Sequence, residues 1–201
     1  MRSLVYYVAS TVDGFIAGPG GQFDFFFSAD GDHMAAIGEE YPETIPVHFR
    51  SALGVDPPNR TIDTVLEGRH SFQLGLDEGV PNAYPHLRHL VFSRTLRESP
   101  DPGVELVATD PVERVRKLKR EDGRRIWLCG GGQIAGVLRD EIDELAIKIY
   151  PVTIGSGRPL FGGAGFAPRH LRVTSSRTFD DGVVFVHYAR GGRADNTTEP
   201  S

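Results

Sequence analysis

The 201-residue sequence predicts a single α/β domain, in which helices surround a mostly parallel sheet and an antiparallel hairpin forms one edge. Short apolar runs alternate with stretches of helical character along most of the chain. Asp180-Asp181-Gly182 joins the last two predicted strands and has the composition of a tight hairpin turn. The chain length fits one domain, which we assign to residues 1–190, followed by a disordered polar tail at 191–201.

The N-terminal half begins with a strand and then becomes harder to interpret. Leu4–Ala9 is a compact apolar run typical of a buried strand. Residues 28–53 have helical character near His33–Glu40, but Pro42 and Pro46 interrupt it. Thr61–Leu66 is the next apolar run and predicts the second strand.

The middle of the chain predicts two strands, each flanked by a helix. A short helix is expected to open at Gly68, and strands follow at Leu87–Phe92 and Val104–Val107. Asp110 has the character of an N-cap, because Pro111 takes the first helical position after it. The helix that begins there is expected to run to about Arg120.

The C-terminal part predicts a strand, a glycine-rich turn and a helix, and then three further strands. The last two strands are predicted from the hairpin turn Asp180-Asp181-Gly182 that joins them. We expect strands at Arg125–Cys129, Glu144–Tyr150, Leu171–Phe179 and Val183–Ala189, and a helix at about Gln133–Arg139.

Composition excludes several classes of protein. Lys and Arg number 22 against 27 Asp and Glu, a net charge of −5 that argues against a nucleic-acid binder. The single cysteine, Cys129, excludes an intramolecular disulfide framework. Neither a signal peptide nor an apolar run of membrane-spanning length is evident, so we expect a cytoplasmic protein without membrane contact.

The glycine-rich turn Gly130-Gly131-Gly132, followed by Gln133 and Ile134, is the strongest local signal. Glycines allow a ligand to approach the backbone, and a helix N-terminus attracts negative charge, so the turn suits a pyrophosphate. The alternative is a tight turn without a ligand. The spacing also fits a Rossmann fingerprint, but Tyr150-Pro151 stands where that motif requires an acidic residue to hold the ribose.

Two further strand ends carry groups that suit an anion. Gly68-Arg69-His70-Ser71 follows one strand and Ser93-Arg94 follows the next. Arginine and hydroxyl donors bind phosphate well. If the two strands are neighbours in the sheet, Arg69 and Arg94 can converge on one phosphate. By contrast, His89 is expected at the surface.

These signals occur in one order and resemble a known family. The first strand runs into the stretch 9–17 (ASTVDGFIA), the three strand-end signals follow, and 150–161 (YPVTIGSGRPLF) carries the pattern Pro-x-x-x-Gly-x-Gly-x-Pro-Leu-Phe. The chain resembles the dihydrofolate reductase-like fold, a three-layer sandwich. More narrowly, it is similar to stand-alone relatives of the C-terminal reductase domain of the bifunctional riboflavin-biosynthesis deaminase-reductase.

The resemblance implies an NADPH-dependent oxidoreductase and a role for each matching residue. The backbones of Ala9 and Ile16 would hold the nicotinamide carboxamide. The expected cofactor-binding residues at the strand ends are Gly68, Arg69, His70, Ser71, Ser93, Arg94, Gly130, Gly131, Gly132, Gln133 and Ile134. Paired arginines favour NADPH over NADH, because a 2′-phosphate needs cationic partners. A homodimer, formed through the C-terminal hairpin, is a further expectation from the family.

The substrate and the proton donor stay open. A zinc-deaminase signature is absent from the sequence, and residues 73–78 (QLGLDE) replace the acidic segment of the riboflavin enzymes. We expect hydride transfer to a small planar N-heterocyclic or phosphoribosyl-type substrate; a true dihydrofolate reductase or a catalytically silent NADPH-binding protein are the alternatives. Asp24, among four phenylalanines, is the candidate general acid if it is buried; a water-facing loop residue is the other interpretation.

Overall fold

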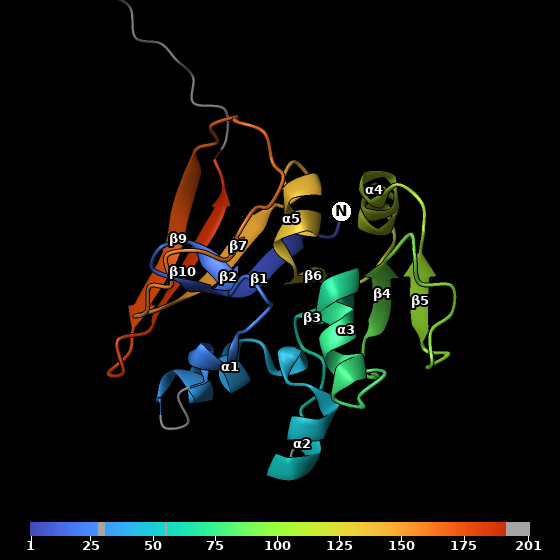
Figure 1. The fold of residues 1–201 in the computed structure, drawn as a ribbon, viewed down its shortest axis with the longest axis horizontal. Coiled ribbons are helices and arrows are strands. Elements are labelled where there is room, and N and C mark those ends of the chain that lie inside the picture. The colour runs from blue at the N-terminus through green and yellow to red at the C-terminus, as the bar shows by residue number, and fades with distance from the viewer. Residues whose placement is uncertain (28–30, 55, 192–201) are drawn as a thin grey trace, which may run out of the picture.

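The computed structural model describes residues 1–27, 31–54 and 56–191, which form a three-layer α/β sandwich (Figure 1). An eight-stranded sheet in the order β5-β4-β3-β6-β1-β7-β10-β9 forms the middle layer. Figure 1 shows β9 and β5, the two sheet edges, at opposite sides of the molecule. The strands are β1 (Leu4–Thr11), β3 (Ile62–Gly68), β4 (Arg88–Phe92), β5 (Val104–Val107), β6 (Arg125–Gly130), β7 (Glu144–Tyr150), β9 (Leu171–Thr178) and β10 (Val184–Arg190).

The pairing of the strands confirms a mostly parallel sheet with an antiparallel C-terminal edge. Every pairing from β5 through β7 is parallel. β10 is antiparallel to both of its neighbours, β7 and β9. The turn at Asp180–Gly182 closes as expected, with the Phe179 N–H donating to Val183 O at 2.9 Å and a φ of 84° at Gly182. The positive φ explains the glycine in this turn.

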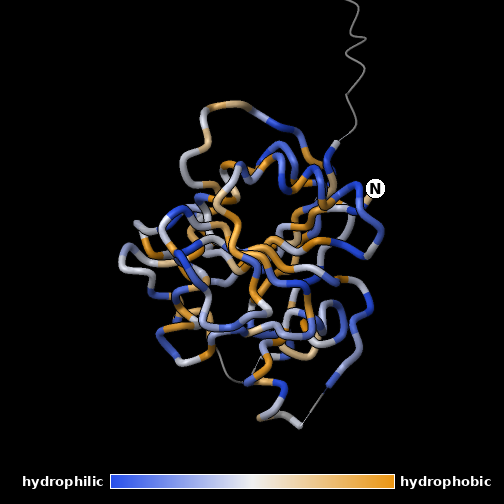
Figure 2. Tube along the Cα trace, turned by 90° about the vertical axis from the view of Figure 1, so that its right-hand side faces the viewer, coloured by the Kyte–Doolittle hydropathy of each residue, from blue (hydrophilic) through white to orange (hydrophobic). Residues whose placement is uncertain are grey.

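One face of the sheet packs against α4 (Pro111–Arg120) and α5 (Gly132–Val137), and we call it the α4–α5 face. Figure 2 shows hydrophobic segments gathered in the middle of the molecule and hydrophilic segments around it. A fully buried leucine side chain contributes about 1.5–3 kcal/mol to the free energy of unfolding through the apolar area it buries. The cluster on this face includes Leu66, Leu90, Leu128, Val115, Leu118, Ile134 and Leu138.

The opposite face packs against α1 (His33–Glu40) and α3 (Arg69–Asp77), and we call it the α1–α3 face. Successive strand residues point to opposite sides, so Val91 faces away from the cluster that contains Leu90. Phe72 of α3 packs on Val91 and Val104. Ala36 of α1 lies in a separate cluster with Tyr150 and Phe185. A third cluster, which includes Tyr7 and Trp127, lies on the same face, on the strands between those that carry the other two clusters.

The segment before the second long strand is a series of short helices. The 3-10 helices η1 (Asp24–Phe26) and η2 (Pro42–Thr44) accompany α1 and α2 (Val47–Leu53). Pro46 precedes α2 as its N-cap, and Pro42 takes the first position of η2. The prolines therefore divide the region, because proline cannot donate the hydrogen bond that a longer helix needs.

Helix ends agree in part with expectation. The Asp110 carboxylate accepts a hydrogen bond from the Val112 N–H at 2.8 Å, which confirms the predicted N-cap of α4. α5 begins at Gly132 and ends at Val137, earlier at both ends than the predicted helix.

From residue 192 onward, the predicted tail lies outside the described residues. Within the described ranges, no helix has both the length and the apolar character needed to cross a membrane.

A second, two-stranded sheet pairs β2 (Phe15–Ala17) with β8 (Arg158–Pro159), and the sequence did not predict it. A Cβ at Gly157 would lie 2.3 Å from the Ala17 carbonyl oxygen, so only glycine permits this approach. Asp13 reinforces the connection, accepting hydrogen bonds from the Thr11 hydroxyl at 2.6 Å and the Gly155 N–H at 2.7 Å. These hydrogen bonds lower the pKa of Asp13, the Thr11 hydroxyl contributing most.

Candidate functional site

Three predicted signals meet at the carboxyl edge of the parallel sheet. β4, β3 and β6 are consecutive neighbours, and Gly68 is paired with Phe92, while Glu67 is paired with Gly130. The segments that follow these strands therefore start side by side. Ligands of open parallel sheets bind beyond the carboxyl ends of the strands. This edge is the candidate site.

The glycine turn after β6 lies against the start of α3. A Cβ built on Gly130 would be 3.2 Å from the Ser71 Oγ, and one on Gly131 would be 3.5 Å from it. A Cβ on Gly68 would lie 3.3 Å from Ile134 Cγ2. The lack of side chains thus leaves backbone and one hydroxyl facing each other, a cradle that larger residues would fill.

Packing alone accounts for the glycine at position 132. A Cβ there would lie 2.0 Å from the Pro159 carbonyl oxygen, and one at Gly136 would lie 2.0 Å from the carbonyl oxygen of Gly162. The Gly162 N–H also donates to Gly132 O at 2.8 Å. α5 therefore rests directly on the backbone of residues 159–164. The contact of Gly132 with a pyrophosphate stays a prediction.

Arg69, the first residue of α3, has a buried hydrogen-bond donor without an acceptor among the described residues. Its side chain is partly buried, and its Nη1 atom is fully buried with no hydrogen-bond partner among the described residues. A guanidinium stays ionised, and an unpartnered buried donor costs about 1–3 kcal/mol. A phosphate oxygen at this position would supply the missing acceptor.

The other strand-end residues differ in which of their polar groups are free to contact a ligand. The Ser93 Oγ accepts from the Leu96 N–H at 2.9 Å, so this hydroxyl shapes its own loop and keeps only its proton to donate. Arg94, His70 and Gln133 are exposed at the edge. β3 and β4 are neighbours, which meets the condition for Arg69 and Arg94 to serve one phosphate.

Ala9 and Ile16 lie on the two sheets that meet at the end of β1. Ala9 is paired with Lys148 of β7. Ile16 lies between the paired residues Phe15 and Ala17, where the register of β2 against β8 shifts. A register shift leaves backbone groups outside the regular ladder, which suits the predicted role of Ile16 in holding a carboxamide.

Asp24 does not lie where a general acid with a raised pKa is expected. It is the first residue of η1, and its side chain is exposed, whereas its neighbour Phe26 is 7% exposed. The hypothesis that Asp24 is a general acid requires its carboxylate to be buried among apolar side chains. In the structure Phe26 is buried and the Asp24 carboxylate is not. A catalytic role for Asp24 stays a prediction without support from burial.

A buried polar cluster lies on the α1–α3 face near the same edge, and sequence reasoning missed it. The expectation that His89 is a surface residue is wrong: it is 1% exposed, and its Nε2 lies 2.8 Å from a Glu67 carboxylate oxygen. Its Nδ1 lies 3.0 Å from Asn82 Oδ1. The Tyr84 hydroxyl lies 3.9 Å from Cys129 Sγ, and burial raises the pKa of both groups, with Glu67 raising that of Cys129 further.

Lys148 completes this cluster from β7. Its ammonium nitrogen lies 4.1 Å from the centroid of the Tyr7 ring. Burial lowers the pKa of Lys148 to about 8, and the Cys129 thiolate form would oppose that shift. In the sequence, a single lysine within an apolar strand permits two interpretations, a side chain that enters the pocket or one that faces solvent at a sheet edge.

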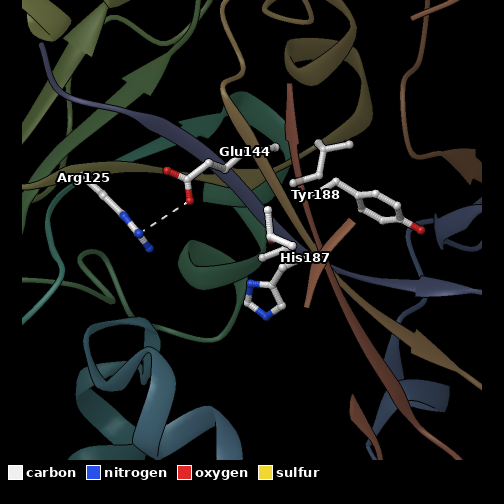
Figure 3. Close-up of a pocket in the computed structure, with 8 residues that line it drawn as sticks. Arg125, Glu144, His187 and Tyr188 are labelled. Carbon is white, nitrogen blue, oxygen red and sulfur yellow. Dashed lines mark ion pairs between the residues drawn. The ribbon is translucent and has the colours of Figure 1, made fainter. Parts of the chain in front are cut away.

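A separate cavity of about 270 Å³ opens where the parallel strands β6 and β7 begin, at the end of the sheet opposite the candidate site (Figure 3). Arg125 and Glu144, the first residues of β6 and β7, line it and form an ion pair at 3.6 Å. His187 also lines it and pairs with Glu40 at 3.2 Å. The cavity contains none of the predicted site residues, and its charges already have partners, so we do not assign the ligand site to it.

The carboxyl edge fits a phosphorylated dinucleotide. The cradle of Gly130, Gly131 and Ser71 offers backbone and hydroxyl contacts without side-chain obstruction. The unpartnered Nη1 of Arg69 requires an acceptor. The α3 N-terminus adds N–H groups that lack helical partners.

Comparisons of sequence agree with the resemblance noted above. Residues 2–185 match the family model described as the RibD C-terminal domain. YyaP of Bacillus subtilis (strain 168), described as an uncharacterized protein, is 30% identical in an alignment 205 positions long that covers 95% of this chain and 96% of YyaP. YwjB of the same organism, also described as uncharacterized, is 28% identical over 191 residues, covering 94% of this chain and 98% of YwjB.

Solved structures show the same fold. A putative riboflavin biosynthesis protein from Shewanella sp. PV-4 aligns with a TM-score of 0.68 and 24% identity, covering 96% of this chain and all of that one (100%). A diaminohydroxyphosphoribosylaminopyrimidine deaminase/5-amino-6-(5-phosphoribosylamino)uracil reductase from Thermotoga maritima aligns with a TM-score of 0.63 and 17% identity. This match covers 94% of our chain but 57% of the Thermotoga chain. The fold is the predicted dihydrofolate reductase-like sandwich, and the match to the family model shows that the chain belongs to the RibD C-terminal domain family.

Proposed function

We propose that this protein is an NADPH-dependent reductase that transfers hydride to a small planar N-heterocyclic or phosphoribosyl-type substrate. Membership of the RibD C-terminal domain family supports a reductase of the riboflavin-pathway type. The buried, unpartnered Nη1 of Arg69 at the carboxyl edge is the structural observation that carries the proposal, because it calls for an anion there.

Each part of the edge has a task in this proposal. Arg69 and Arg94 bind the 2′-phosphate, and Ser71 with the glycine turn binds the pyrophosphate. The backbones of Ala9 and Ile16 hold the nicotinamide carboxamide near the end of β1. NADPH supplies the hydride when it is bound, and the protein contributes orientation and the exclusion of water.

Binding of NADPH is expected to stabilise the fold. At a ligand concentration of about 100 times the dissociation constant, the free energy of unfolding should rise by about 2.7 kcal/mol. We expect a higher melting temperature with NADPH than with the same concentration of NADH. Trp127 is 4% exposed on β6, the strand that leads into the glycine turn, so its fluorescence provides an independent titration signal.

The control for this measurement is 2′,5′-ADP, which carries the phosphate without the nicotinamide. Stabilisation by NADPH and by 2′,5′-ADP, with little from NADH, would support the 2′-phosphate contact. The absence of any melting shift or fluorescence change with NADPH would contradict the proposed function.

We also propose that the protein forms a homodimer through β9. All eight residues of this edge strand are exposed, with Leu171 at 43% and Val173 at 54%. An exposed edge strand with apolar side chains is normally covered by another chain or protected by charge. A second copy of the same hairpin would cover it.

Val173→Lys is expected to convert the dimer to a monomer, because it places a charge in the proposed interface. Val137→Lys is the matched control, since Val137 is also 54% exposed but lies on α5. Sedimentation equilibrium gives the mass of each variant. A wild-type chain that is monomeric at micromolar concentration would contradict this proposal.

A further inference from the structure

The pairing of β1 with β7 brings one ionisable side chain next to the proposed nicotinamide position. Ala9 is paired with Lys148 in the parallel register, so the two residues are direct neighbours across the sheet. Phe185 of β10 flanks Lys148 on its other side. Tyr7, whose ring lies beneath the Lys148 ammonium, is two residues before Ala9 and therefore shares its face.

The surroundings of Lys148 leave its ammonium free to act on a ligand. Lys119, by comparison, pairs with Asp143 at 2.6 Å, whereas Lys148 forms no ion pair with any residue in the described part of the chain. The Tyr7 hydroxyl is also buried and without a partner among those residues, and Tyr7 is 3% exposed. A buried hydroxyl without a partner, next to an ammonium without an ion pair among the described residues, points to a ligand that contacts both.

We propose that Lys148 is the proton donor to the hydride acceptor, an inference that rests on the proposed function. The acceptor is a C=N or C=O bond in a planar substrate bound on the α1–α3 face, between α1 and α3. As hydride from NADPH forms a bond to the carbon, the Lys148 ammonium gives its proton to the nitrogen or oxygen. The products are the reduced substrate, NADP⁺ and a neutral Lys148 amine, which takes a proton back from water.

Other ionisable groups near the edge are less suited to this step. The Tyr150 hydroxyl lies 3.2 Å from the Nε2 of His33, and burial raises its pKa to about 12. The His33 ring is in turn held by Asp181. Glu67 is engaged with His89, and Asp24 is exposed.

The state of Lys148 also fits a donor at neutral pH. Burial lowers its pKa to about 8, and the groups that face it, Tyr7 from β1 and Cys129 from β6, are both neutral because burial raises the pKa of each. At pH 7 such an amine still carries its proton, yet it loses that proton more readily than an ordinary lysine.

The chain has three lysines, which permits a direct test by NMR. Reductive methylation with ¹³C-formaldehyde labels Lys117, Lys119, Lys148 and the terminal amine, and Lys148→Arg assigns the signal of interest. We expect the Lys148 methyl signal to titrate near pH 8, and the exposed Lys117 provides a reference signal.

The decisive comparison is between the NADP⁺ and NADPH complexes, which differ by one positive charge on the nicotinamide ring. A cation beside that ring should have a pKa lower by about 0.5–1 pH unit in the NADP⁺ complex. Lys117 is the internal control and should not change. Equal titration of Lys148 in both complexes would overturn the assignment. If the melting temperature shows no binding of either nucleotide, the proposed function itself fails, and this assignment with it.

Discussion

Replacing Gly136 by alanine is expected to destabilise the protein by about 3 kcal/mol, although alanine normally favours a helix. The new Cβ would lie 2.0 Å from the Gly162 carbonyl oxygen and 3.3 Å from the Ala164 N. These are backbone atoms that cannot rotate away, so α5 or the 159–164 segment must move. For a domain of this size, we expect the melting temperature to fall by roughly 6–12 °C.

Gly38→Ala is the matched control, because Gly38 is also helical and a Cβ there would meet nothing within 4 Å. This variant should be more stable than the wild type by about 0.5–1 kcal/mol. Urea unfolding measures both changes. Equal stability of the Gly136 and Gly38 variants would show that α5 does not pack as the structure has it.

Gly132→Ala separates packing from ligand contact. Its Cβ would collide with the Pro159 carbonyl oxygen at 2.0 Å, so it should destabilise the fold about as much as Gly136→Ala. Gly136 is outside the predicted cofactor contacts. A loss of NADPH affinity in the Gly132 variant beyond that of the Gly136 variant would therefore assign Gly132 to the pyrophosphate.

Arg69→Ala is expected to weaken NADPH binding about 10- to 100-fold while leaving NADH binding nearly unchanged. One charge-assisted contact with a phosphate is worth about 1.5–3 kcal/mol, and only NADPH carries the 2′-phosphate. Without a nucleotide, this variant should be as stable as the wild type or more so, because it removes a buried donor that has no partner among the described residues.

Arg94→Ala should have a smaller effect, since Arg94 is exposed and solvent screens its charge. The double variant should lose the preference for NADPH. Arg97→Ala is the matched control, as Arg97 is exposed on the same loop after β4. Trp127 fluorescence gives the dissociation constants for NADPH and NADH. If the ratio of these two constants is the same in the double variant as in the wild type, neither arginine recognises the 2′-phosphate.

Much of the fold follows from local sequence patterns. Seven strands of the main sheet coincide with runs rich in apolar residues, because each buries side chains on at least one face. The eighth, β9, is exposed along its whole length, and its signal was the turn at Asp180–Gly182 that follows it. The β2–β8 sheet was not predictable, since strands of three and two residues show no periodicity. The error at His89 has a similar cause: a histidine beside Arg88 at the start of β4 does not reveal that both faces of this strand are covered.

The sequence by itself determined the class of fold, the family and the strand-end segments that form the candidate site. Only the tertiary structure decided which of those segments are neighbours and which side chains find partners. It left the Arg69 Nη1 without an acceptor among the described residues, exposed Asp24, and paired Lys148 with Ala9. The physical reason is that strand formation depends on nearby residues, whereas strand order, close backbone contact and burial depend on residues far apart in the chain.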